Sequence, residues 1–410
     1  MPAEFDLRSL DEEPPTPSSV DVRRAIADGR RRRARRGAGY AGAATLTVFA
    51  VVGASVAAGG LFTDARPNAG ASGSPKASYT IPGIAGWTAP PATAPSSCAL
   101  ERLPVPDNAP MALTAGADPA GRYIVGRTYP KAGGYQAVIW HDGNVTKVML
   151  PGDLEEQLQD VNSTGTAVGW SYQDTGPVPY VYRDGRVSQL PGVKHGSALA
   201  INDAGAIVGD DSAGAALLWP SATAEPIRLP LPAGASAATA NDIDEDGTVV
   251  GSIDRKRPYV WFADGTHREL PMPTLDGKPA VSARVFTIRN GWATGVASTS
   301  TDREKGDPTG KGAPAGPIRW NVRTGEVRVF DQLGIQASTA NALGWPIGTD
   351  KQGRAVLVTD TATVALPGLA GHQPGGLSDI PTTLSDDGRT ITGQSDDANG
   401  TIQAVVWRCR

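Results

Sequence analysis

Residues 198–230, "ALAINDAGAIVGDDSAGAALLWPSATAEPIRLP", decide the fold. This stretch contains four short apolar runs: the first leads into an Asn-Asp turn, the second ends in Val-Gly, the third ends in Trp and the fourth ends in Leu-Pro. Gly and Asx residues stand between the runs, where tight turns between strands require them. The stretch therefore predicts one unit of four short β-strands.

The pattern repeats along the chain. Clear copies are residues 158–191 and 240–271, and weaker copies begin near residues 114, 286, 339 and 382. The glycine that closes the second run recurs at intervals of 40 to 53 residues, at Gly126, Gly169, Gly209, Gly251, Gly295, Gly348 and Gly393. A four-stranded unit of about 40–45 residues is the size of a propeller blade, so seven units predict an all-β, seven-bladed β-propeller over residues 98–410. A stack of β-sandwiches is the alternative, but it would leave one sheet of each unit without a partner face.

The last unit is incomplete. It ends at Trp407 and three further residues, without a fourth run. A spare run ending in Leu-Pro, "CALERLP" at residues 98–104, precedes the first complete unit. We therefore expect the N-terminal strand to complete the last blade and close the ring.

The only two cysteines lie at this closure. Aligned on Leu-Pro, Cys98 matches Val145 of the first unit, and aligned on Trp, Cys409 matches Asp142. Because those two positions flank a hairpin turn, Cys98 and Cys409 are expected to face each other and form a disulfide bond in an oxidising compartment. Two unpaired buried cysteines are the alternative.

Residues 37–62 form an apolar segment with no charged residue. As a helix it would span roughly 39 Å, enough for a hydrocarbon core of about 30 Å. Six arginines precede it, which predicts a transmembrane signal anchor with a cytoplasmic N-terminus and an extracytoplasmic C-terminal domain. These arginines are Arg30, Arg31, Arg32, Arg33, Arg35 and Arg36. A cleaved signal peptide and a buried soluble helix are the alternatives.

The segments beside this anchor have distinct compositions. Residues 1–36 form a basic, cytoplasmic tail, and residues 63–97 form a Pro/Ala/Ser/Gly-rich linker. The tail carries nine Arg against seven Asp or Glu, a charge of about +2. Because the whole chain has a net charge of −4, the rest of the chain carries about −6. That acidic balance argues against nucleic-acid binding, so the expected lipid contact is the anchor itself.

The repeat resembles a known family. Residues 198–209, "ALAINDAGAIVG", and the runs "QAVIW" (136–140) and "QAVVW" (403–407) resemble the HAF-type repeat of exported bacterial proteins. That repeat reads approximately A-x-x-I-N-x-x-G-x-V-V-G followed by H-A-F-x-W, with His and Phe replaced here. The resemblance implies an exported β-repeat domain over residues 98–410, and it implies no catalytic residue.

One acidic stretch is a candidate calcium site. Asp242, Asp244 and Asp246 stand at alternate positions before a glycine, as at the start of a calcium-binding loop. The twelfth position is Ile253 instead of Glu. The repeat offers another explanation, since Asp244 aligns with Asn162 and Asn202 and would simply shape a turn. No other cofactor is expected.

The tryptophans fall into two groups. Five share one place in the repeat, which predicts packing between blades; they are Trp140, Trp219, Trp261, Trp320 and Trp407. Trp170, Trp292 and Trp345 lie near or within the second strand and break this pattern. They are candidates for a ligand surface, with core packing as the alternative.

These observations favour a binding or scaffold module, monomeric, for an extracytoplasmic protein or a cell-envelope glycan. The chain has no G-x-S-x-G motif, no phosphate-binding glycine loop and no His set with metal-ligand spacing. An enzyme with its site at the channel mouth, such as a lyase, lactonase or glycosidase, is the first alternative. Signal transmission through the cytoplasmic tail, by contact with a regulator or anionic lipid, is the second.

Overall fold

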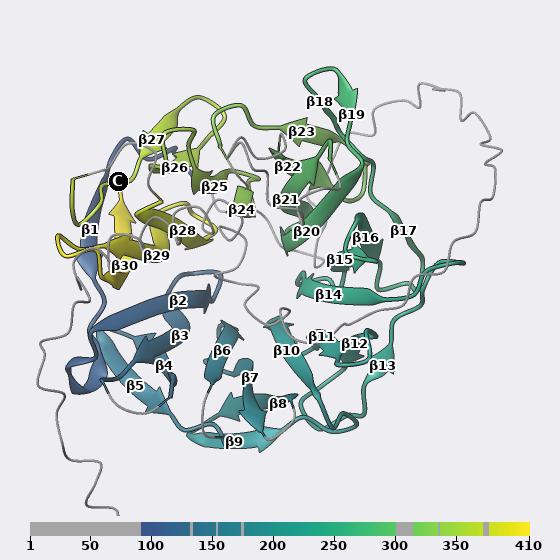
Figure 1. The fold of residues 1–410 in the computed structure, drawn as a ribbon, viewed down its shortest axis with the longest axis horizontal. Coiled ribbons are helices and arrows are strands. Elements are labelled where there is room, and N and C mark those ends of the chain that lie inside the picture. The colour runs from purple at the N-terminus through teal and green to yellow at the C-terminus, as the bar shows by residue number, and fades with distance from the viewer. Residues whose placement is uncertain are drawn as a thin grey trace, which may run out of the picture.

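The computed structural model describes residues 92–131, 134–152, 155–173, 176–300, 315–334, 337–371 and 377–410. They form seven four-stranded antiparallel sheets arranged as blades in a ring, as Figure 1 shows. The predicted all-β, seven-bladed propeller is therefore confirmed. The tail, the apolar segment and the linker up to residue 91 lie outside the described residues, so the signal anchor stays a prediction. Within the described part of the chain, no helix is long and apolar enough to cross a bilayer.

The strands follow one another blade by blade, from the channel outward. Blades 1 to 3 comprise β2 (Met111–Ala117), β3 (Tyr123–Tyr129), β4 (Gln136–His141) and β5 (Asn144–Val148); β6 (Glu156–Val161), β7 (Ala167–Gln173), β8 (Gly176–Arg183) and β9 (Arg186–Gln189); and β10 (Gly196–Ile201), β11 (Ile207–Asp211), β12 (Ala216–Trp219) and β13 (Ile227–Arg228). Blades 4 and 5 comprise β14 (Ala238–Ile243), β15 (Val249–Ile253), β16 (Arg257–Trp261) and β17 (His267–Glu269); and β20 (Ser282–Arg289), β21 (Trp292–Ser298), β22 (Ala315–Asn321) and β23 (Val327–Val329).

The remaining strands complete the ring. Blade 6 comprises β24 (Ala337–Ala340), β25 (Pro346–Thr349), β26 (Ala355–Val358) and β27 (Thr363–Ala365), and blade 7 comprises β28 (Asp379–Leu384), β29 (Thr390–Asp396), β30 (Ile402–Cys409) and β1 (Cys98–Arg102). A 3-10 turn, η2 (Pro106–Asn108), follows β1, and a small hairpin of β18 (Thr274–Leu275) and β19 (Lys278–Pro279) precedes blade 5.

The recurring glycine has a specific backbone cause. The first strand of every blade contains a β-bulge, where two residues oppose one on the second strand. In blade 3 the register shifts between Ala198 and Ala200, and Ala198 pairs with Gly209. A Cβ atom at Gly209 would lie 1.9 Å from the carbonyl oxygen of Ser197. Only glycine admits so close an approach, so the repeated glycine and the bulge accompany each other around the ring.

The repeated tryptophans join neighbouring blades. Trp219 of blade 3 donates from its indole Nε1 to the carbonyl oxygen of Pro191, which follows the last strand of blade 2, at 3.0 Å. The same bond, at 2.7–2.8 Å, joins Trp140 to Pro104, Trp261 to Pro230, Trp320 to Pro271 and Trp407 to Pro367. All five indoles are buried. The predicted blade packing is confirmed, and in these five cases the proline carbonyl group of a Leu-Pro pair accepts from the Trp of the following unit.

Closure of the ring follows the expected plan, with one correction. Strand β1 pairs with β30, with Cys98 opposite Cys409, and the two form a disulfide. Leu100 lies opposite Trp407, as Val145 lies opposite Trp140 in blade 1. Cys98 therefore corresponds to residue 143 and not to Val145, because the Leu-Pro of blade 1 lies two residues further along its chain.

The corrected register places the disulfide where blade 1 has its hairpin turn. In blade 1, Asp142 and Gly143 connect β4 to β5, both with positive φ (50° and 74°), as a two-residue turn with a type I′ twist requires. In blade 7 the corresponding two positions are Cys409 and Cys98. A sulfur–sulfur bond thus replaces the peptide connection between the last two strands.

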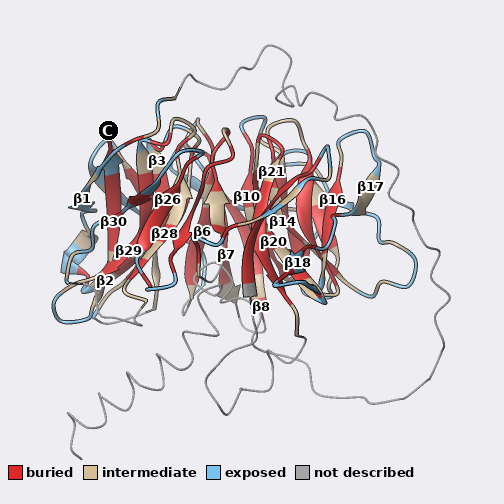
Figure 2. Ribbon diagram, turned by 90° about the horizontal axis from the view of Figure 1, so that it is seen from above, coloured by how far each residue is buried: buried red, intermediate tan, exposed pale blue. Residues whose placement is uncertain are grey.

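The hydrophobic core lies between adjacent blades. Figure 2 shows buried residues throughout the sheets. One cluster joins Val125 and Ile139 of blade 1 to Leu158 and Val178 of blade 2, and similar clusters fill the other seams. Because each sheet buries both faces against its neighbours, each blade depends on the blades beside it for stability.

Candidate functional site

A cavity of about 200 Å³ lies at the centre of the ring. Its wall comes from the first strands of all seven blades, from the bulges to the turns that follow these strands. The bulged residue of every blade belongs to this wall. Drug-sized ligands occupy sites of roughly 300–1,000 Å³, so this cavity suits a small polar group or the end of a larger ligand.

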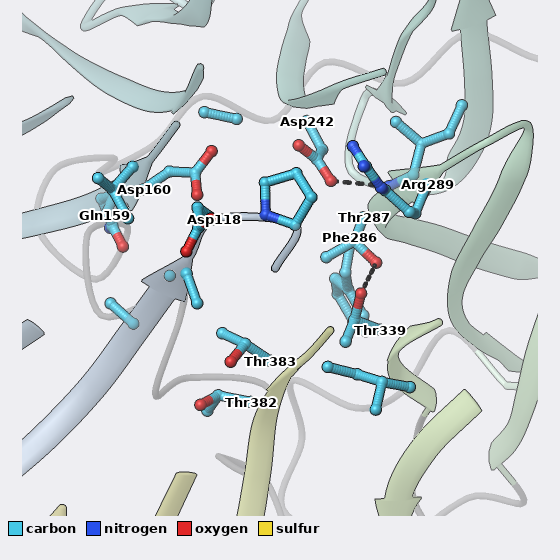
Figure 3. Close-up of a pocket in the computed structure, with 18 of the residues that line it drawn as sticks. Asp118, Gln159, Asp160, Asp242, Phe286, Thr287, Arg289, Thr339, Thr382 and Thr383 are labelled. Atoms are coloured by element: carbon cyan, nitrogen blue, oxygen red, sulfur yellow. Dashed lines mark hydrogen bonds between the residues drawn. The ribbon is translucent and has the colours of Figure 1, made fainter. Parts of the chain in front are cut away.

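One side of the wall is acidic. Asp160 of β6 and Asp242 of β14 each follow the bulged residue of their strand, and Figure 3 shows both at the cavity. Asp160 accepts a hydrogen bond from the backbone N–H of Ile201 at 2.9 Å. Asp242 accepts one from the backbone N–H of Ile288 at 2.7 Å. Each carboxyl group therefore links its blade to the next one while it borders the cavity.

The surroundings of these two carboxyl groups disfavour their charged forms. Both side chains are half-buried at the cavity wall. Burial raises the pKa of Asp160 to about 7, against the opposing effect of the backbone N–H of Ile201. Burial, and then the charge of Asp160, raise the pKa of Asp242 well above its usual value. The raised pKa values favour the protonated forms, in which a carboxyl group can both donate and accept hydrogen bonds.

The opposite side of the wall carries hydroxyl groups. Thr287 of blade 5 and Thr339 of blade 6 are joined between their Oγ1 atoms at 3.1 Å, as drawn in Figure 3. Thr382 and Thr383 of blade 7 continue this side, and Thr382 bonds to Thr114 of blade 1 at 2.7 Å. Phe286 adds an aromatic ring to the same side of the wall. The cavity is thus acidic toward blades 2 and 4 and rich in hydroxyl groups toward blades 5 to 7.

An ion-pair network borders the cavity where the first strands end. Arg289 donates to Glu245 at 2.8 Å and, through two nitrogens, to Asp386 at 2.6 and 2.9 Å. These contacts raise the pKa of Arg289 above its usual value despite its burial, so it stays charged. Arg289 thereby connects the turns of blades 4, 5 and 7 around one mouth of the cavity.

The three aspartates of the candidate calcium loop have separate partners. Asp242 borders the cavity, whereas Asp244 is buried and accepts from the backbone N–H groups of Asn290 (2.9 Å) and Gly291 (2.6 Å) of blade 5. Asp246 pairs with Arg323. No three His, Cys, Asp or Glu side chains within the described ranges gather as a metal site would require. Asp244 therefore joins blade 4 to blade 5, and calcium binding stays a prediction for experiment.

The three irregular tryptophans do not border the cavity. Trp170 and Trp345 are 1% and 6% exposed, which favours the alternative of core packing for both, and their role as a ligand surface stays a prediction. Trp345 packs in the seam between blades 6 and 7 and donates to Asp360 at 3.3 Å. Trp292 is half-buried and stacks on the guanidinium group of Arg319, 4.1 Å from its ring centre. Packing in the blades explains these departures from the repeat.

Sequence reasoning missed the residues that do border the cavity, notably Gln159, Asp160, Phe286 and Arg289. A signal was present in the sequence. Asn162, Asn202 and Asp244 are equivalent turn residues of blades 2, 3 and 4. The residue two positions earlier is Asp160 in blade 2 and Asp242 in blade 4, but Ala200 in blade 3. An acidic side chain at this position of the first strand marks the channel wall in blades 2 and 4.

Comparisons with known proteins support the fold. No family model and no curated protein sequence matches the chain. Among solved structures, the chain is similar to oligogalacturonate lyase in complex with manganese, with 12% identity and a TM-score of 0.51 over 78% of this chain and 96% of that one. It is also similar to YCF48 from Cyanidioschyzon merolae (10% identity, TM-score 0.43, 76% and 98% covered) and to YCF48 bound to D1 peptide (12%, 0.44, 78% and 98%). At such low sequence identity, the structural similarity supports the propeller fold of this chain and no statement about its activity.

Proposed function

We propose that this protein is a single-pass, membrane-anchored propeller that stands outside the cell and binds a protein or glycan of the cell envelope at its channel mouth. The arginines of residues 30–36 and the apolar segment 37–62 support the anchor and its orientation. The Cys98–Cys409 disulfide supports an oxidising compartment, because cytosolic thiols are kept reduced. The resemblance to the HAF-type repeat supports export of the domain.

The composition of the cavity wall carries the proposal. Residues that recur in every unit build the blades, whereas those at the cavity differ between blades: Asp160, Ala200, Asp242 and Thr339 occupy corresponding places. Carboxyl, hydroxyl and amide groups around one aromatic ring are the means by which pockets orient a polar ligand. The turns around the mouth would contact the rest of a larger partner.

Capture from envelope fractions tests this proposal. The tagged full-length chain is incubated with solubilised envelope proteins and with fragmented envelope glycan, and bound material is identified. Ser338→Trp places a bulky ring at the cavity wall, and Ser188→Trp places the same ring on the exposed outer strand of blade 2. We expect the first variant to lose capture and the second to retain it. Equal capture by both would contradict binding at the channel.

An acid–base enzyme acting on a glycan is the second candidate, and one observation favours it. Asp160 and Asp242 are two neighbouring carboxyl groups with raised pKa values in a cavity, an arrangement that acid–base catalysts share. Incubation of the full-length chain with envelope glycan, followed by analysis of the released fragments, separates the two functions. Fragments that disappear in both Asp160→Asn and Asp242→Asn would favour the enzyme. Capture without fragments would favour the binding module.

A further inference from the structure

One donor in the cavity has no partner within the described residues. Gln159 is only 7% exposed and belongs to the cavity wall beside Asp160, as Figure 3 shows. Its Oε1 accepts a hydrogen bond from Nε2 of Gln157 at 2.8 Å. Its own Nε2 meets no acceptor in the described part of the chain. An amide N–H group at a cavity wall that meets no acceptor among the described residues is available to a ligand that accepts a hydrogen bond there.

Arg127 and Gln157, on the side of Gln159 away from the cavity, fix the orientation of the Gln159 amide. Arg127 donates from Nη1 to Oε1 of Gln157 at 2.8 Å. A guanidinium group has donors only, so the oxygen of Gln157 must face Arg127 and its amide nitrogen must face Gln159. The oxygen of Gln159 is then occupied, and its NH₂ group remains for the cavity. Arg127 itself is buried and lies over the rings of Tyr129 (5.2 Å) and Tyr135 (4.7 Å).

The chemistry of the cavity selects among ligand classes. An anionic ligand would be repelled by whichever of the carboxyl groups of Asp160 and Asp242 is ionised. A ligand ammonium group has donors only, so it would leave the NH₂ group of Gln159 unpaired. A hydroxyl group accepts from Gln159 and donates to a carboxyl oxygen of Asp160 at the same time. The Thr hydroxyls and the ring of Phe286 add polar and apolar contacts for a hydroxylated ring.

We propose that the cavity binds one ring of a neutral sugar, with Gln159 as an obligate donor whose orientation Arg127 sets through Gln157. This inference rests on the proposed binding function and deepens it by naming the ligand class. It also separates two roles. Gln159 would touch the ligand, whereas Arg127 and Gln157 do not line the cavity and would act as positioning residues.

Titration of the full-length chain with single sugars tests the ligand class. The probes are glucose and N-acetylglucosamine, which are neutral, and glucosamine, which carries an ammonium group at pH 7; binding is followed by calorimetry or by NMR. We expect a neutral sugar to bind more tightly than glucosamine. Tighter binding of glucosamine would overturn the proposal.

Variants test the donor and its positioning. Gln159→Glu replaces the donor by an acceptor and is expected to weaken sugar binding by about tenfold, as loss of one hydrogen bond allows. Gln189→Glu, the same change on an exposed strand, is the matched control. Arg127→Met frees both amides to rotate and is expected to weaken binding severalfold, whereas Arg127→Lys keeps a donor and is expected to restore it. Unchanged affinity in Gln159→Glu would overturn the role of Gln159, and equal affinity of Met and Lys variants would overturn the role of Arg127.

The outcomes distinguish this inference from the function beneath it. If the chain captures envelope material but binds no neutral sugar, the sugar inference fails and the binding function stands. If it does neither, both fail. Thermal melting of each variant accompanies the titrations, and a folded Gln159→Glu chain with lost affinity supports the inference.

Discussion

The seams between blades and the wall of the cavity obey opposite rules. At the seams the same chemistry recurs, as when Trp219 and Trp320 donate to the proline carbonyl groups that end the preceding blades. At the wall, one column of the repeat holds Asp160, Ala200 and Thr339 in different blades. The difference indicates that residues repeated between blades hold the ring together, whereas residues that vary between blades form the cavity wall. Changes at the seams should therefore cost stability, and changes at the wall should cost little stability.

Removal of residues 1–104 should have the largest effect. It deletes β1, leaves β30 as an exposed edge and removes the carbonyl group of Pro104 that accepts from Trp140. We expect the truncated chain to lose its cooperative unfolding transition and to be digested rapidly by protease. Circular dichroism melting and limited proteolysis measure both. A truncated chain that melts within a few degrees of the full-length protein would show that the closure is dispensable.

Substitution of one seam tryptophan should come next. Trp320 is fully buried, so Trp320→Ala should lower the free energy of unfolding by about 3–5 kcal/mol. Trp320→Phe keeps most of the apolar volume but loses the bond to Pro271, and a loss of about 1–2 kcal/mol is expected. Urea denaturation measures both. Equal losses for Ala and Phe would mean that the hydrogen bond, and not burial, dominates the seam.

Opening the disulfide should have a smaller effect. Cys98 and Cys409 are 311 residues apart in sequence, for which the chain-entropy model gives a ceiling of roughly 5–6 kcal/mol. Cys409→Ser should lower the free energy of unfolding by about 2–4 kcal/mol, below that ceiling, because the pairing of β1 with β30 persists. Peptide mapping without reduction is the companion measurement. Alkylation of both thiols in the unreduced wild-type protein would contradict the bond.

At the cavity wall, Asp160→Asn should even stabilise the protein at high pH. The folded-state pKa of Asp160, about 7, lies above the unfolded value near 4, so the folded state binds the proton more tightly. Its contribution to stability is fully present below pH 4 and is lost as pH rises through 7. Asn cannot ionise, so Asp160→Asn should exceed wild type by up to about 4 kcal/mol at pH 8, at about 1.36 kcal/mol for each pKa unit, and match it closely at pH 4.

The control for this pH prediction is Asp184→Asn, at an exposed turn of blade 2 with positive φ, where Asn is tolerated. Its stability should follow wild type at both pH values. Denaturant titrations at pH 4 and 8 measure all three proteins. A wild type that gains stability between pH 4 and 8 relative to Asp160→Asn would mean that the carboxylate is favoured in the folded state.

The smallest effect is expected at the aspartate-rich turn. Asp244 already accepts from the backbone of blade 5, and Asp246 pairs with Arg323, so these groups have partners without a metal ion. Addition of calcium, or of a chelator, should leave the melting temperature unchanged. A calcium-dependent rise of several degrees would identify this loop as a binding site.

Repetition explains how much of the fold the sequence predicted. The seven glycines mark a bulge that every blade contains, and the five tryptophans and the spare Leu-Pro mark contacts that recur at most seams, so the ring and its closure could be inferred. The register at Cys98 was displaced by two residues, because the Leu-Pro of blade 1 is itself displaced from its strand. Side-chain burial was harder to infer, and Trp170 shows why: a departure from the repeat can simply fill a seam.

The site was harder to infer because it is assembled from the first strands of seven blades, which lie far apart in the sequence. Asp160 and Asp242 lie 82 positions apart, and their charges interact only because the ring closes. The relay from Arg127 through Gln157 to Gln159 crosses from one blade to the next. No spacing along the chain reports such contacts, although polar residues at or directly after the bulge, such as Gln159 and Asp160, mark part of the cavity wall.

Because the disulfide takes the place of a hairpin connection, the propeller could be opened at another hairpin turn instead. Cys98 and Cys409 occupy the two positions that form the hairpin turn in blade 1. The disulfide therefore closes the polypeptide from β1 to β30 into a covalent ring of seven blades. A short peptide could stand in for the sulfur bridge, and new ends could be opened between Asp142 and Gly143 without cutting a strand. Circular permutants of this kind would share one architecture and differ only in where synthesis begins.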